Sequence, residues 1–130
     1  YKGKSVKTNN VTDAKLVNNT KKAMGDKPVI VIVNTTNPFV LSEVEPAASA
    51  ILISFGLQDQ ALLDIISGKA EPQALLPMQM PADMATVEQQ SEDSPFDLKV
   101  YKDQDGNQYD FAFGMNWQGV ISDERVNKFK

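Results

Sequence analysis

The chain has 130 residues, 42% of them apolar and 23% charged, which is typical of one folded domain with a core and not of a disordered chain. Its net charge is −4, and only Lys21 and Lys22 among its 13 basic residues are adjacent, which excludes a basic surface for nucleic acid. Histidine and cysteine are absent, which excludes typical zinc sites, disulfides and histidine- or cysteine-based nucleophiles, so any catalysis would depend on carboxylates, lysine or tyrosine.

The N-terminal segment, residues 1–11, is polar and aperiodic and is interpreted as a segment leading into the domain. The chain begins at Tyr1 and not at Met, which favours a fragment of a longer protein. The longest apolar run, Val29 to Val33, is far shorter than the ~20 residues that a membrane-spanning helix needs, so no membrane partner is predicted.

An α/β core is predicted over residues 12–81. Apolar residues recur at helical spacing after Thr12, a good helix-capping residue, and predict a helix over 13–24 that ends at Gly25. The run 29–33 is apolar at every position and β-branched, as in a strand covered on both faces. A helix followed by such a strand favours parallel pairing.

The second half of this core repeats the same kinds of element. Residues 50–54 predict another buried strand, and residues 58–67 predict a helix with a wide apolar face that stops at Gly68. Between the strands, only one helical turn is expected, around Ser42 to Glu45, because Pro46 interrupts the segment.

The C-terminal half has a different character. Prolines at 72, 77 and 81 allow at most a short edge strand between them. Residues 82–95 are polar and predict a surface loop, residues 96–117 predict a β-hairpin turning at Asp105-Gly106 followed by an aromatic segment, and residues 118–130 predict a charged tail.

An acidic stretch in the hairpin raises the question of a calcium site. Asp103, Asp105 and Asn107 have the spacing of the first calcium ligands of an EF-hand loop, but Gln108 stands where glycine is needed and Gly114 where the bidentate glutamate is needed. A turn rich in Asp, Asn and Gly explains the stretch better. No metal or cofactor site is predicted.

Aromatic residues follow this turn and could form either a core or a sugar-stacking surface. Tyr109, Phe111 and Phe113 alternate at a period of two, which predicts that all three pack against the domain from one side of a strand. Trp117 lies outside this alternation and is the candidate substrate-binding residue.

Two further patterns resemble parts of catalytic or phosphate sites. Glu43 with Glu45, and Asp103 with Asp105, are carboxylates two positions apart, but solvated turn residues explain them better, since spacing alone cannot show the distance that a glycosidase pair needs. The segment before the second helix contains only Gly56, whereas a dinucleotide fingerprint needs three glycines. No catalytic residue is predicted.

The ordered set of elements resembles the later part of the C-terminal α/β sandwich domain of glycoside hydrolase family 3, the β-glucosidases and their relatives. The match runs from Gly25 to Trp117 and consists of the segments KPVIVIVN, AILISFG, QALLDIISG, EPQALLPMQMP and YDFAFGMNW. Each segment is weak alone, and their order makes the resemblance specific. It implies a three-layer sandwich with a flavodoxin-like portion, ending in the C-terminal hairpin.

The chain departs from the family pattern in three loops. Gln73-Ala74-Leu75 replaces Ser-Gly and a basic residue, the glycine-rich loop before the helix is reduced to Gly56 with Leu57-Gln58-Asp59, and Asn34-Thr35-Thr36-Asn37-Pro38 replaces Asn-Gly-Arg-Pro. The positions of the family's Phe-Gly-x-Gly-Leu run are taken by Phe111-Ala112-Phe113-Gly114-Met115. These departures put ligand contacts from the loops in doubt but not the scaffold.

The resemblance implies a role in a larger enzyme. Family 3 enzymes are usually retaining, with an aspartate nucleophile on an upstream barrel domain and often a glutamate acid/base near the start of the sandwich. Both residues would precede Tyr1, so the chain alone is expected to be inactive and to scaffold a β-glycosidase site that binds carbohydrate beside that barrel. Family habit suggests a periplasmic or secreted location.

An alternative hypothesis is a stand-alone, non-catalytic binding or interaction module of flavodoxin-like build. It rests on the absence of histidine, cysteine and a convincing carboxylate pair. If the chain is a fragment, a half sheet that lacks its upstream strands would leave a strand edge and apolar surface uncovered, which predicts a homodimer through the sheet edge or another cover for that edge.

Overall fold

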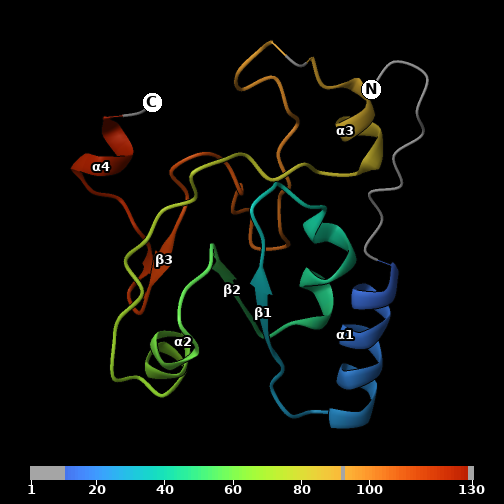
Figure 1. Cartoon of the computed structure of the whole chain (residues 1–130), viewed down its shortest axis with the longest axis vertical. Helices are drawn as coiled ribbons and strands as arrows, with labels where there is room; N and C mark the ends of the chain where they lie inside the picture. Colours follow the sequence, from blue (N-terminus) through green and yellow to red (C-terminus); the bar gives the residue numbers. More distant parts are fainter. Residues whose placement is uncertain (1–10, 92, 129–130) are drawn as a thin grey trace.

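The computed structural model describes residues 11–91 and 93–128 and contains helices and two small sheets (Figure 1). In chain order the elements are α1 (Val11–Met24), β1 (Ile30–Asn34), the 3-10 turns η1 (Leu41–Glu43) and η2 (Glu45–Ala47), β2 (Ala50–Ser54), α2 (Asp59–Ile66), α3 (Met84–Gln89), β3 (Met115–Asn116), β4 (Gly119–Val120) and α4 (Glu124–Asn127). No helix among these residues is long and apolar enough to cross a membrane.

The first part of the chain follows the predicted α/β pattern. The predicted helices and strands are confirmed, with ends within two residues of those expected. Strands β1 and β2 pair in parallel, with Ile30 opposite Ala50 and Asn34 opposite Ser54. The single helical turn expected around residues 42–45 is present as the two 3-10 turns.

The core lies on one face of this parallel pair. Leu41 and Met80 are fully buried, and Val17 of α1 and Ile53 of β2 pack against their cluster. In Figure 1 the 3-10 turns that carry Leu41 lie between β1 and α1. The 3-10 turns thus pack between the helix and the sheet and belong to the same apolar core.

The other face of the pair is only partly covered by the described residues. Side chains alternate across a strand, so Ile30 and Ile32 point away from the core, and they are 44% and 43% exposed. The apolar run of β1 predicts cover on both faces, but within residues 11–91 and 93–128 the cover on the side of Ile30 and Ile32 is incomplete.

The predicted hairpin region is more irregular than expected. Backbone hydrogen bonds join Met80 to both Tyr101 and Tyr109, and antiparallel bridges form at Pro81–Val100 and Lys102–Gln108 without continuous strands. Pro81 lacks an N–H group, which limits extension of the ladder. The regular antiparallel pair is instead β3 with β4, further along the chain.

Two segments predicted to lack regular structure contain helices, and these predictions are wrong. Helix α3 lies within the expected loop 82–95, and β4 and α4 lie within the expected tail 118–130. Both helices are short and begin at an aspartate cap: Asp83 accepts the backbone N–H of Thr86 at 2.8 Å, and Asp123 accepts that of Arg125 at 2.9 Å. In the sequence these two helices are indicated by their aspartate caps and not by apolar periodicity.

Candidate functional site

The acidic stretch at 103–107 forms a closed turn. The two carboxylate oxygens of Asp103 accept the backbone N–H and the side-chain amide of Asn107, each at 2.8 Å. Burial raises the pKa of Asp103, but the hydrogen bonds from Asn107 and the neighbouring backbone outweigh it and hold the pKa below its ordinary value. Both carboxylate oxygens of Asp103 are therefore hydrogen-bonded within the turn itself.

Asp110, just after this turn, has different partners. Asp110 Oδ1 accepts hydrogen bonds from the side chain of Gln79 and the backbone N–H of Phe111, both at 2.7 Å. Among the residues that the structure describes, no group of three acidic side chains is close enough to hold a metal ion.

Of the carboxylate pair Glu43 and Glu45, the second member is hydrogen-bonded within the domain. Glu45 accepts the hydroxyl of Tyr101 at 2.7 Å, which joins η2 to the bridged segment. Burial first, and then this hydrogen bond, raise the pKa of Tyr101, while burial and the charge of Asp103 raise the pKa of Tyr109 to about 12. Neutral tyrosines here serve as packing and hydrogen-bonding groups.

The predicted one-sided row of aromatics is split in two. The Tyr109 ring packs on Phe113 with centroids 4.8 Å apart, whereas Phe111 meets Phe96 edge to face at 5.6 Å. The physical reason is Ala112, whose φ of 64° lies in the left-handed region and breaks the alternation of an extended strand. A glycine takes this conformation without strain, and glycine is what the resemblance expects there.

Trp117 lies at the turn between β3 and β4. Its side chain is among the exposed large apolar groups, at 59%, and its backbone N–H donates to Glu71 Oε1 at 3.4 Å. It lines neither of the two pockets described below.

The loops at the carboxyl ends of β1 and β2 are tied to each other. Asn34 Oδ1 accepts the N–H of Gly56, and Ser54 Oγ accepts that of Leu57, each at 3.1 Å. Gly56 has a φ of 91°, which favours glycine. These polar groups close the loop and do not form a row of free donors for phosphate.

A segment that departs from the family pattern is fixed by the C-terminal helix. Arg125 holds Asp123 through its side chain, at 2.7 Å, and donates to the backbone oxygen of Gln73 at 2.7 Å. Gly114 packs so closely on Ala74 that a Cβ there would collide with the Ala74 carbonyl oxygen. The 73–76 segment is thus held from two sides.

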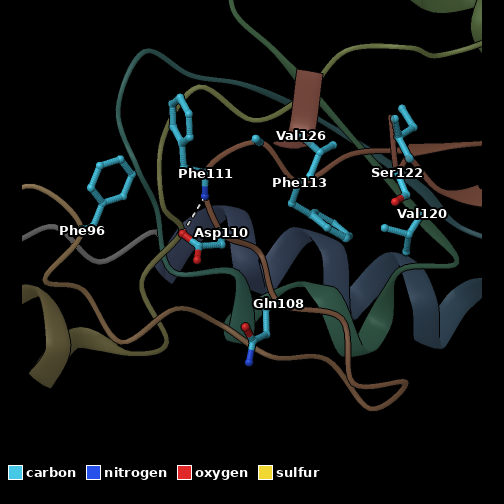
Figure 2. A pocket seen from close by; sticks show the side chains of 10 residues that line it. Phe96, Gln108, Asp110, Phe111, Phe113, Val120, Ser122 and Val126 are labelled. Atoms are coloured by element: carbon cyan, nitrogen blue, oxygen red, sulfur yellow. Dashed lines mark hydrogen bonds between the residues drawn. The ribbon is translucent and has the colours of Figure 1, made fainter. Parts of the chain in front are cut away.

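An apolar pocket of about 520 Å³ opens beside Phe111 (Figure 2). It is lined by Phe96, Gln108, Asp110, Phe111, Ala112, Phe113, Val120, Ile121, Ser122 and Val126. The sequence alone did not predict this pocket, because four of its ten lining residues come from the segment interpreted as a tail. The apolar residues Val120, Ile121 and Val126 around a capping Asp123 were the signal available for it. A smaller pocket of about 280 Å³ shares Phe96 and Phe111 with it and is also lined by Pro38 and Pro77.

Comparison with known proteins identifies the family. A model described as "Glycosyl hydrolase family 3 C-terminal domain" matches residues 4–117. Beta-glucosidase C of Emericella nidulans is 38% identical over 78 residues, covering 60% of this chain and 13% of that protein. No solved structure matches.

Two further relatives agree. A probable beta-glucosidase C of Aspergillus oryzae is 37% identical over 87 residues, or 63% of this chain and 14% of that protein. A periplasmic beta-glucosidase/beta-xylosidase of Dickeya chrysanthemi is 32% identical over 76 residues, or 58% of this chain and 12% of that protein. The chain therefore spans a small fraction of these relatives' length, and it belongs to the glycosyl hydrolase family 3 C-terminal domain family.

Proposed function

We propose that this chain is the later part of the C-terminal sandwich domain of a retaining β-glycosidase, and that it scaffolds an active site next to a barrel domain of the same longer protein, here called the parent. The observation that carries the proposal is the family match over residues 4–117 together with relatives named as β-glucosidases that are several times longer. The nucleophile and the acid/base would lie outside this chain.

The finer architecture of the proposal is a three-layer, flavodoxin-like sandwich. Residues 12–81 would form its α/β core and residues 96–117 the hairpin and aromatic segment. The leading segment predicted at 1–11 lies outside the described residues except for Val11, which begins α1. Support comes from the parallel pairing of β1 and β2 and from the exposed apolar side chains of Ile30 and Ile32, since an exposed apolar sheet face is expected to be covered by a further layer.

The described carboxylates support a scaffolding role. Glu45 is engaged by Tyr101, Asp103 by Asn107, and Asp123 by Arg125. A glycosidase needs an acid and a second carboxylate facing one bond with separated pKa values. None of these three carboxylates faces another in that way, so the chemistry is assigned to the rest of the parent.

Trp117 is the residue of this chain that we propose as a carbohydrate contact. Its exposed indole offers an apolar face for stacking on a sugar, and its backbone is fixed by the β3–β4 turn and by Glu71. In the parent, Trp117→Ala is expected to raise KM about three- to tenfold with little change in kcat, as the loss of uniform binding predicts. An unchanged KM would contradict the proposal that Trp117 contacts the carbohydrate.

The proposal is tested by hydrolysis of nitrophenyl β-glucoside and nitrophenyl β-xyloside. The parent is expected to hydrolyse at least one of them with retention of anomeric configuration, and the 130-residue chain neither. Lack of β-glycosidase activity in the parent would contradict the proposal and favour a stand-alone binding module.

A further inference from the structure

We propose that the pocket beside Phe111 binds a neutral glycoside. The inference rests on the proposed function for its class of ligand, but it is carried by the geometry of the pocket. Its volume of about 520 Å³ lies within the range of small-molecule sites.

The first observation is where the chain is strained. Among residues 11–91 and 93–128, the non-glycine residues with positive φ are Phe96, at 61°, and Ala112, at 64°, and both line this pocket. Such conformations cost free energy and persist only where surrounding structure holds them, and they concentrate at ligand sites. The strain at Ala112 also turns Phe111 and Phe113 apart, which opens the space between them.

The second observation is the placement of polar groups around these rings. Figure 2 shows Asp110 between Phe111 and Gln108, with Phe96 on one side and Phe113 and Ser122 on the other. Asp110 Oδ1 is held by Gln79 and by the N–H of Phe111, whereas within the described part of the chain no donor reaches Oδ2. A fixed carboxylate oxygen is thus available to accept a hydrogen bond.

These groups together fit a neutral sugar. Rings of phenylalanine pack on the C–H faces of a pyranose, and carboxylate and amide groups bind its hydroxyls. The carboxylate of Asp110 disfavours an anionic ligand through like-charge repulsion, and the chain as a whole carries a net charge of −4. A neutral glycoside is therefore favoured over a uronic acid.

The test is an NMR titration of the nitrogen-15-labelled 130-residue chain with cellobiose. We expect a dissociation constant on the order of 1 mM, since a small ligand in an open pocket buries little area. The shifts should be confined to the amides of the pocket, including Ala112, Phe113 and Ile121, and glucuronic acid should not reproduce them.

Two variants and a matched control complete the experiment. Phe96→Ala removes a ring that is 62% exposed and should weaken cellobiose binding about three- to tenfold, whereas Phe55→Ala, at an exposed phenylalanine outside the pocket, should leave it unchanged. Asp110→Asn keeps the side-chain shape and should admit glucuronic acid. The spectrum of each variant also reports whether it is folded.

The outcomes separate this proposal from the proposed function. The proposal that the pocket binds a glycoside would be overturned by an absence of shifts at about 20 mM cellobiose, which is far above the expected dissociation constant. It would also be overturned if Phe96→Ala and Phe55→Ala weakened cellobiose binding equally. Either result would count even if the parent hydrolyses glycosides. Cellobiose binding that depends on Phe96 and Asp110 would support the proposal that the pocket binds a glycoside, even if the parent had no glycosidase activity.

Discussion

The parallel-sheet region, residues 11–66, and the region from 73 to 126 are stabilised in different ways. The first contains regular helices and strands, yet it leaves Ile30 and Ile32 exposed on one sheet face. The second has few regular elements, and it is held by single backbone hydrogen bonds, by the close approach at Gly114 and by Arg125. Regular structure and complete packing are therefore separate properties, since the more regular region still leaves apolar side chains of its sheet exposed.

The largest expected effect concerns the two faces of the sheet. Leu41→Ala, at a fully buried position, should lower the free energy of unfolding by about 3 kcal/mol, whereas Ile32→Ala, on the uncovered face, should lower it by less than about 1 kcal/mol. Urea unfolding of the isolated chain measures both. Equal losses would mean that the Ile32 face is covered in solution.

The close approach at Gly114 gives the next effect. A Cβ on Gly114 would collide with the Ala74 carbonyl oxygen and lie 2.9 Å from Leu75 Cδ2, so Gly114→Ala should cost about 2–3 kcal/mol. The matched control is Gly25→Ala, where a Cβ meets nothing within 4 Å and only the φ of 59° is unfavourable, at about 1 kcal/mol. If the two variants are equally stable, the 73–76 segment is not packed against Gly114.

Self-association tests the uncovered face itself. We propose that the isolated chain forms a homodimer through the edge and exposed face of the β1–β2 pair, because apolar surface and unpaired strand groups favour association. Ile32→Lys should weaken dimerisation at least about tenfold, because it places a charge in the interface. Sedimentation velocity measures this, and a wild-type chain that stays monomeric at high concentration would contradict it.

The smallest effect is a pH dependence in the second region. Both Tyr101 and Tyr109 have raised pKa values, to about 12 for Tyr109, so the folded state keeps them neutral while the unfolded state ionises them near the ordinary value of 10.0. Stability from this source is full below pH 10 and is lost as pH rises towards 12. Alkaline unfolding followed by tyrosinate absorbance should shift to higher pH when Tyr109 is replaced by Phe, and no shift would show that Tyr109 ionises freely in the folded state.

Sequence reasoning predicted the first region well and the second poorly. Apolar periodicity determines where α1, β1, β2 and α2 form, because burying those patterns is what stabilises them. Helices α3 and α4 depend on aspartate caps within polar stretches, and the split of Phe111 from Phe113 depends on one left-handed residue, Ala112. Neither signal has a period, so pattern analysis could not find them.

The candidate site follows the same division. The resemblance placed Ala112 at a glycine position, which is the one indication of unusual backbone there. The pocket itself needs Phe96 to approach Phe111 across 15 positions and the 120–126 segment to fold back beside them. Such long-range contacts are set by tertiary packing and are not encoded in local spacing.

The most direct test of the central claim, that this chain is one section of a larger family 3 domain, is hydrogen exchange at β1 in two contexts. Among the described residues β1 pairs only with β2, so the backbone amides of residues 30–34 that do not point at β2 should exchange rapidly in the isolated chain. They should exchange at least about a hundredfold more slowly in the parent, where we expect a further part of the domain to pair with that edge. Equal exchange rates in both would contradict the account, because that edge of β1 would then be unpaired in the parent as well.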